Sequence, residues 1–246
     1  MGAATYFRRA IETLERVAAS QTEALAQAAE RMVGAITDGK AIYSFGASHS
    51  FMITEELVYR TGGLMLVNPI YPHGMNLFVR PMTSTSKLER VPGLGKVLLD
   101  TAPVAAGDIV LVTSTSGRNP VPIDLAIAAR ERGASIIGIT ALAYTDAVTS
   151  RHPQGLKLKD VCDVLLDNGA PHGDAAVTIE GFAQAVGPLS SITGIALANA
   201  LMVETVDRLV AQGYTPPVFV SANLDEGDAF NARLLAENQH RIHYLG

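Results

Sequence analysis

The sequence predicts an α/β fold: a doubly wound, mostly parallel five-stranded sheet flanked by helices, preceded by a long N-terminal helix. From residue 41 onward, short apolar runs alternate with stretches of helical periodicity. Four of the five runs are β-branched and almost continuous, which is typical of strands buried on both faces. Repeated strand–helix alternation favours a parallel sheet with helices on both sides.

The N-terminal segment 3–36 is expected to form one amphipathic helix. Its apolar positions nearly follow a heptad repeat that only Gln21 interrupts. At a rise of 1.5 Å per residue, the apolar stripe would extend for roughly 50 Å. A neighbouring helix or a partner subunit would have to cover it, and we therefore expect a homodimer or a larger homo-oligomer.

The remaining elements follow from the same periodicities. Strands are expected over 41–45, 65–67, 109–113, 136–140 and 161–166, and helices over 51–60, 87–99, 121–132 and 187–212. Residues 70–86 show little periodicity, and a loop of this length is usually functional or mobile. We expect one domain over 1–246, made of the helical segment 1–36, the α/β core 37–213 and a turn-rich tail 214–246.

Composition excludes several classes of protein. The net charge is −5 and only 17% of the residues are charged, so the chain carries no electrostatic signature for nucleic acid or an anionic membrane. The apolar stretch 189–210 contains Asn199, Glu204, Asp207 and Arg208 and is interpreted as a buried helix. The single cysteine, Cys162, and the absence of a secretory signal favour the cytoplasm.

Two short polar loops follow predicted strands and open helices. The first contains Gly46, Ser48, His49 and Ser50, and the second contains Ser114, Thr115, Ser116, Gly117 and Asn119. Ligands of open α/β sheets bind at the carboxyl ends of the strands, and a helix N-terminus attracts anions. Both loops together predict an uncharged hydroxyl cradle (Ser48, Ser50, Ser114, Thr115 and Ser116) for a phosphate group, although serine and threonine also cap helices without binding a ligand.

The run Ser114-Thr115-Ser116-Gly117 resembles the phosphate loop of SIS (sugar isomerase) domains, and residues 46–50 resemble their first loop. Three further segments, 56–63, 173–175 and 221–223, resemble the bacterial UPF0309 subgroup. The resemblance spans most of the chain. It implies a SIS-type sheet, a phosphorylated sugar as ligand, and pairing of subunits through helices.

Isomerisation needs a group that removes a proton next to a carbonyl and returns it to the neighbouring carbon. The resemblance implies a glutamate on the helix after the first loop, where Glu56 is the candidate base and Glu55 lies beside it. The alternative is that both are part of a solvated helix face. His49 and His172 are candidate acids by position, and Asp174 is a candidate ligand of sugar hydroxyls.

The leading function is aldose–ketose isomerisation of a sugar phosphate. The alternatives are a lyase or etherase acting on an amino-sugar phosphate and a non-catalytic phosphosugar sensor. We expect no cofactor and no metal site, because His172 and Asp174 alone are a weak ligand set.

Overall fold

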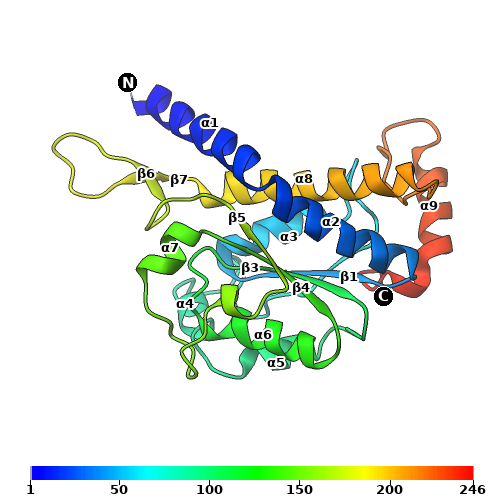
Figure 1. The fold of residues 1–246 in the computed structure, drawn as a ribbon, viewed down its shortest axis with the longest axis horizontal. Coiled ribbons are helices and arrows are strands. Elements are labelled where there is room, and N and C mark those ends of the chain that lie inside the picture. The colour runs from blue at the N-terminus through cyan, green and yellow to red at the C-terminus, as the bar shows by residue number, and fades with distance from the viewer. Residues whose placement is uncertain (1, 246) are drawn as a thin grey trace.

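The computed structural model describes residues 2–245, which form a five-stranded parallel sheet between two layers of helices, as predicted (Figure 1). The strands are β1 (Ile42–Gly46), β2 (Val67–Pro69), β3 (Ile109–Thr113), β4 (Ser135–Thr140) and β5 (Val164–Asp167), with β6 (Ala175–Val177) and β7 (Val186–Pro188) in a separate antiparallel pair. The main helices are α1 (Gly2–Ser20), α2 (Thr22–Thr37), α3 (Phe51–Leu57), α4 (Ser84–Leu88), α5 (Leu94–Leu99), α6 (Pro120–Glu131), α7 (Leu142–Ala147), α8 (Ser190–Ala211) and α9 (Gly227–Asn238). Three short 3₁₀ turns complete the set: η1 (Ser48–Ser50), η2 (Leu158–Asp160) and η3 (Gln239–Arg241).

The strand order is β2-β1-β3-β4-β5, with every neighbouring pair parallel. The chain moves outward from β1 to β2 and then returns to β3 on the other side of β1. This reversal makes the β1/β3 boundary the switch point of the sheet, where ligands of doubly wound folds bind.

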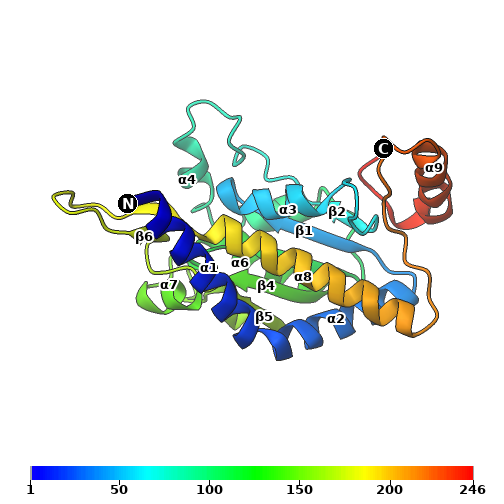
Figure 2. The same ribbon diagram turned by 90° about the horizontal axis from the view of Figure 1, so that it is seen from above.

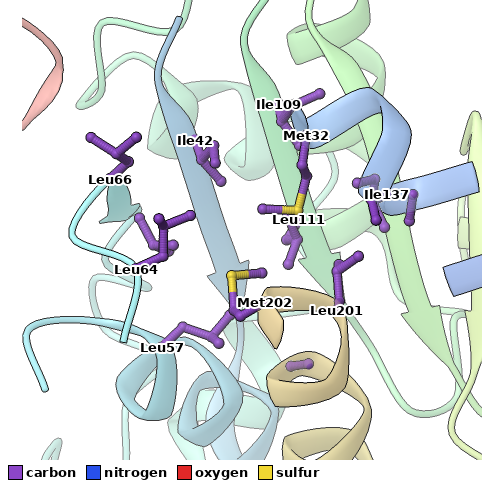
Figure 3. Close-up of a cluster of buried hydrophobic side chains, with 14 of the residues drawn as sticks. Met32, Ile42, Leu57, Leu64, Leu66, Ile109, Leu111, Ile137, Leu201 and Met202 are labelled. Atoms are coloured by element: carbon purple, nitrogen blue, oxygen red, sulfur yellow. The ribbon is translucent and has the colours of Figure 1, made fainter. Parts of the chain in front are cut away.

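Alternation along each strand divides the core between the two faces. Ile42, Ile109, Leu111 and Ile137 pack with Met32 of α2 and with Leu201 and Met202 of α8 (Figure 3). On the opposite face, Tyr43, Phe45, Val110 and Val112 pack against apolar residues of α5 and α6. The apolar runs are continuous because both faces of these strands are buried.

The predicted single helix over 3–36 is wrong in one respect, because it is divided between α1 and α2 at Gln21. Gln21 leaves the helical conformation at φ −102° and ψ 4°, and its Oε1 accepts a hydrogen bond of 2.9 Å from the backbone N–H of Asp167 at the end of β5. The polar residue that interrupted the heptad therefore bends the chain. As a result, α2 covers the sheet while α1 extends beyond it beside the β6–β7 pair (Figure 2).

Two further expectations are corrected. The predicted helix 87–99 is two short helices, α4 and α5, because Pro92 lies between them and Gly93 adopts a left-handed conformation with φ 82°. The tail is not only turns, since it contains α9. In the part of the chain that the structure describes, no helix is both long and apolar enough to cross a membrane.

Candidate functional site

The first polar loop leaves β1 at Gly46 and turns at once into η1. A Cβ atom on Gly46 would lie 2.3 Å from the carbonyl oxygen of Ser50, so only glycine allows the turn to fold back this closely. Ser48 has a positive φ of 55°, which is rare for a residue other than glycine. Its N–H donates to Met75 O at 2.8 Å, so the turn is attached to the long loop 70–86.

The second polar loop leaves β3, the neighbour of β1, and leads into α6. Gly117 has φ 59°, and a Cβ there would meet the hydroxyl oxygens of Thr140 and Thr145 at 3.0 Å. Asn119 and Pro120 then start α6, whose twelve residues point their N-terminus toward the loop. Such a terminus presents free N–H groups and a positive partial charge.

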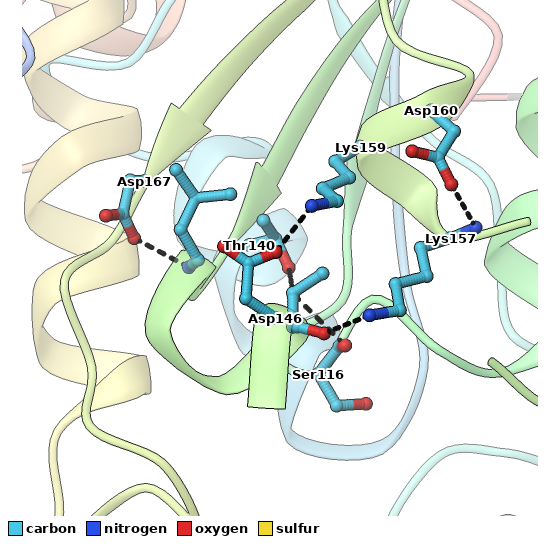
Figure 4. A network of polar contacts seen from close by, with 9 residues as sticks. Ser116, Thr140, Asp146, Lys157, Lys159, Asp160 and Asp167 are labelled. Atoms are coloured by element: carbon cyan, nitrogen blue, oxygen red, sulfur yellow. Dashed lines mark hydrogen bonds and ion pairs between the residues drawn. The ribbon is translucent and has the colours of Figure 1, made fainter. Parts of the chain in front are cut away.

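A polar network behind the second loop holds its backbone in place (Figure 4). The Thr140 hydroxyl donates to Ser114 O at 2.7 Å, and the Thr145 hydroxyl donates to Ser116 O at 3.1 Å. Lys157 Nζ donates to Thr145 O at 2.6 Å. Because Thr140 and Thr145 donate to backbone carbonyl groups of the loop, they order it without using the hydroxyls of Ser114, Thr115 and Ser116.

Both loops line one cavity of about 250 Å³. All five residues of the hydroxyl cradle contribute to its wall, together with Ala47, His49, Glu89, Asn119, Tyr144, Gly173 and Asp174. The sequence therefore identified most of the lining residues, and the structure brings the two loops together as expected. Hydroxyl donors and a helix N-terminus suit an anion.

Glu89 is the carboxyl-bearing cavity residue that the sequence analysis missed. It follows α4 in a segment that we had expected to be one continuous helix. Burial raises the pKa of its carboxyl above the ordinary value, and this outweighs the hydrogen bond from Asn119 and the charges of Arg90 and Arg151, which lower it. The Pro92–Gly93 break was the only signal in the sequence that this glutamate is not on a solvated helix face.

Asn119 connects the cavity to Arg151. Its Oδ1 accepts a hydrogen bond of 3.0 Å from Arg151 Nη1, so its amide nitrogen is the group that can donate to Glu89. The Asn119 side chain makes no capping hydrogen bond to α6. This residue therefore orients the Glu89 carboxyl, a function that its position in the loop had not indicated.

Asp174 lies in the cavity wall with a left-handed backbone (φ 66°). Its carboxylate accepts hydrogen bonds from the N–H groups of Leu189 and Ser190 and from the Ser190 hydroxyl, at 2.6–3.0 Å. A carboxylate has roughly four acceptor positions, so about one stays available for a sugar hydroxyl. Asp174 mainly fixes the start of α8 beside the cavity.

The structure does not bring Glu56 to the hydroxyl cradle. Its Oε1 accepts a hydrogen bond of 2.9 Å from Asn199 Nδ2 on α8 and forms an ion pair with Arg60. It lines a different cavity, of about 340 Å³, between α3 and α8. Within one chain, Glu89 is thus the glutamate in the cavity wall.

The two candidate histidines differ in position. His49 is exposed and lines the cavity. His172 is exposed, and its ring packs edge-on against the lining residue Tyr144 with centroids 5.1 Å apart. Within residues 2–245, no three His, Cys, Asp or Glu side chains are grouped so that they could hold a metal ion.

Comparison with known proteins agrees with this architecture. Residues 5–141 match the SIS domain family. UPF0309 proteins from Shouchella clausii and Oceanobacillus iheyensis are 43% and 42% identical to this chain over 240 residues, which covers 98% of the chain and 98% of each relative.

Solved structures show the same fold at lower identity. A phosphoheptose isomerase from Neisseria gonorrhoeae superposes with a TM-score of 0.54 at 20% identity, covering 83% of this chain and 97% of that one. The Vibrio vulnificus NanR protein, complexed with ManNAc-6P, gives 0.53 at 15% identity and covers 96% of this chain and 69% of that one.

Proposed function

Because the chain belongs to the SIS domain family, and within it to the UPF0309 proteins, we propose that it binds a sugar phosphate and isomerises it between aldose and ketose. The phosphate lies in the hydroxyl cradle at the switch point of the sheet. The observation that carries the proposal is the shared cavity, in which the cradle and a carboxyl with a raised pKa lie together.

In this mechanism Glu89 is the base. Its carboxylate removes the proton from the hydroxyl-bearing carbon next to the carbonyl, and the electron pair forms an enediolate. The same proton is then added to the former carbonyl carbon, while the hydroxyl proton moves to the former carbonyl oxygen, so that the carbonyl and hydroxyl groups exchange places. A raised pKa makes the carboxylate a stronger base. His49, which lines the same cavity, supplies the proton that opens the sugar ring.

The cradle is tested by thermal unfolding with paired ligands. A ligand at a hundred times its dissociation constant stabilises by about 2.7 kcal/mol, which corresponds to a rise in Tm of about 5–11 °C for a chain of this size. Phosphorylated sugars should give this shift and the unphosphorylated forms should not. Ser116→Ala should reduce it, whereas Ser20→Ala, at the exposed end of α1, should not. Equal shifts with and without the phosphate would exclude the cradle.

The base is tested by proton exchange from a bound sugar phosphate in deuterated water. Glu89→Gln should abolish exchange and leave binding nearly intact, because glutamine keeps the shape but cannot accept the proton. Glu56→Gln is the matched comparison, since the structure places Glu56 in the other cavity. If exchange is lost in Glu56→Gln and kept in Glu89→Gln, the assignment is wrong. If no sugar phosphate exchanges although several bind, a non-catalytic sensor replaces the isomerase.

We also propose a homodimer that uses α8. Val203 and Val210 on this helix are 69% and 58% exposed, and both line the cavity that contains Glu56. Burying them against a second copy would remove apolar surface from water. Sedimentation at micromolar concentration should show a dimer that Val203→Asp dissociates. A wild-type species near 26 kDa, the mass of one chain, would refute the assembly.

A further inference from the structure

Three arginines lie next to the hydroxyl cradle and are not used by the proposed mechanism. This arginine cluster consists of Arg90, Arg118 and Arg151. Arg118 lies within the second loop, between Gly117 and Asn119, and its carbonyl oxygen accepts a hydrogen bond of 2.9 Å from the N–H of Arg151. Arg90 directly follows Glu89. Each of the three therefore adjoins a residue of the cavity wall, because Arg90 follows Glu89, Arg118 precedes Asn119 and Arg151 donates to Asn119.

The charge of Arg151 acts on the cavity. Its guanidinium donates to Asn119 and interacts electrostatically with Glu89 and Tyr144, and all three of these residues line the cavity. Burial lowers the pKa of Arg151, and the nearby positive charges of Arg118 and Arg90 lower it further. Like charges at close range destabilise one another.

No ion pair in the described part of the chain neutralises this cluster. Across residues 2–245, the ion pairs with carboxylates involve other basic residues. Glu89 interacts electrostatically with Arg151, but one carboxylate balances at most one of the three positive charges. Arg118 donates from Nη2 to Thr149 Oγ1 at 3.1 Å, and its Nε is buried without a hydrogen-bond partner. A buried, unpartnered donor on a cation is costly unless a ligand satisfies it.

We propose that the arginine cluster binds a second anionic group, so that the substrate is a sugar phosphate that also carries a carboxylate or a second phosphate. Arginine presents paired donors that fit either group in a bidentate manner. The first phosphate occupies the hydroxyl cradle, and this assignment rests on the proposed function. The second anion supplies the charge that the cluster lacks.

Calorimetric titration with matched sugars tests the proposal. The probes are a hexose monophosphate, the corresponding hexose bisphosphate and the corresponding sugar-acid phosphate. We expect at least one dianionic probe to bind ten times more tightly than the monophosphate, and the difference to shrink as salt is added. The better of the two dianionic probes shows whether the second group is a phosphate or a carboxylate.

Variants of the arginine cluster then test whether these side chains cause the preference for a dianionic probe. Arg118→Gln and Arg90→Gln should remove most of the preference for the dianionic probe and change the affinity for the monophosphate less than about twofold. Arg118→Lys keeps the charge but not the paired donors and should recover only part of the preference. Arg8→Gln, on the exposed surface of α1, controls for net charge and should have no effect.

Three results would overturn the inference. If monophosphate and dianionic probes bind equally, the second anion site does not exist, although the cradle remains. If the arginine variants weaken all probes equally, these side chains bind the first phosphate. If no sugar phosphate binds at all, both the cradle and the second site are refuted.

Discussion

Gly46→Ala should damage the site directly, because the first loop turns where no side chain fits. The added Cβ would lie 2.3 Å from Ser50 O and 2.4 Å from Ser50 C. Both atoms are backbone, so relief requires η1 itself to move, and with it Ser48 and Ser50. Overpacking of this kind costs about 1–3 kcal/mol, which predicts a fall in Tm of about 2–12 °C. Affinity for a sugar phosphate should fall at least tenfold.

Gly34→Ala is the matched control, for which we expect the Tm to rise where Gly46→Ala lowers it. Gly34 is exposed in the last part of α2, and a Cβ there would meet nothing within 4 Å. Alanine in a helix is favoured over glycine by about 0.5–1 kcal/mol, so the Tm should rise by about 1–4 °C. Circular dichroism melting gives both shifts, and titration gives the affinities. A Gly46→Ala protein with wild-type Tm and wild-type affinity would refute the argument that close approach at Gly46 positions the cradle.

Three more predictions follow from the titrating and polar groups. The raised pKa of Glu89 means that the folded state holds the carboxyl proton more tightly than the unfolded state does. The free energy of unfolding should therefore fall as the pH rises from the unfolded pKa, near 4.3, through the folded pKa. A plot of Tm against pH should be flatter for Glu89→Gln than for the wild type, and an unchanged slope would contradict the raised pKa. Thr140→Val removes the donor to Ser114 O and should cost about 1–3 kcal/mol in denaturant unfolding, whereas Thr37→Val at the exposed end of α2 should stay within about 0.5 kcal/mol. Burial raises the pKa of Cys162 to about 12, so the folded protein should resist alkylation at pH 8, and rapid labelling without unfolding would show that the thiol is accessible.

The sequence was sufficient to predict that the two polar loops lie together at the carboxyl ends of their strands. β1 and β3 are continuous apolar runs, and parallel strands bring their carboxyl ends to the same edge of the sheet. Placing both polar loops in one cavity therefore needed only the strand assignment and the rule that ligands bind at that edge. The boundary of β3 was predicted without error, whereas β2 begins two residues later than expected.

The proposed base could not be predicted in the same way. Glu89 reaches the cavity because Pro92 and Gly93 divide the segment into α4 and α5, and because the carbonyl of Glu89 accepts a hydrogen bond from Val121 N at the start of α6. Neither effect leaves a periodic signal. Glu56, by contrast, was suggested by resemblance in sequence, but its hydrogen bond to Asn199 holds it against α8.

The residues of the candidate site come from two kinds of segment. The hydroxyl cradle depends on strand ends, on Gly46 and on the Thr140–Thr145 pair at the end of β4 and in α7. Glu89, Arg90 and Arg151 come from irregular segments after α4 and α7, where the backbone tolerates change. Substitutions in those segments can therefore alter which groups of a sugar are recognised while the phosphate stays bound. Under the proposed function, the phosphate would therefore anchor the ligand, and the irregular segments would determine which sugar phosphate reacts.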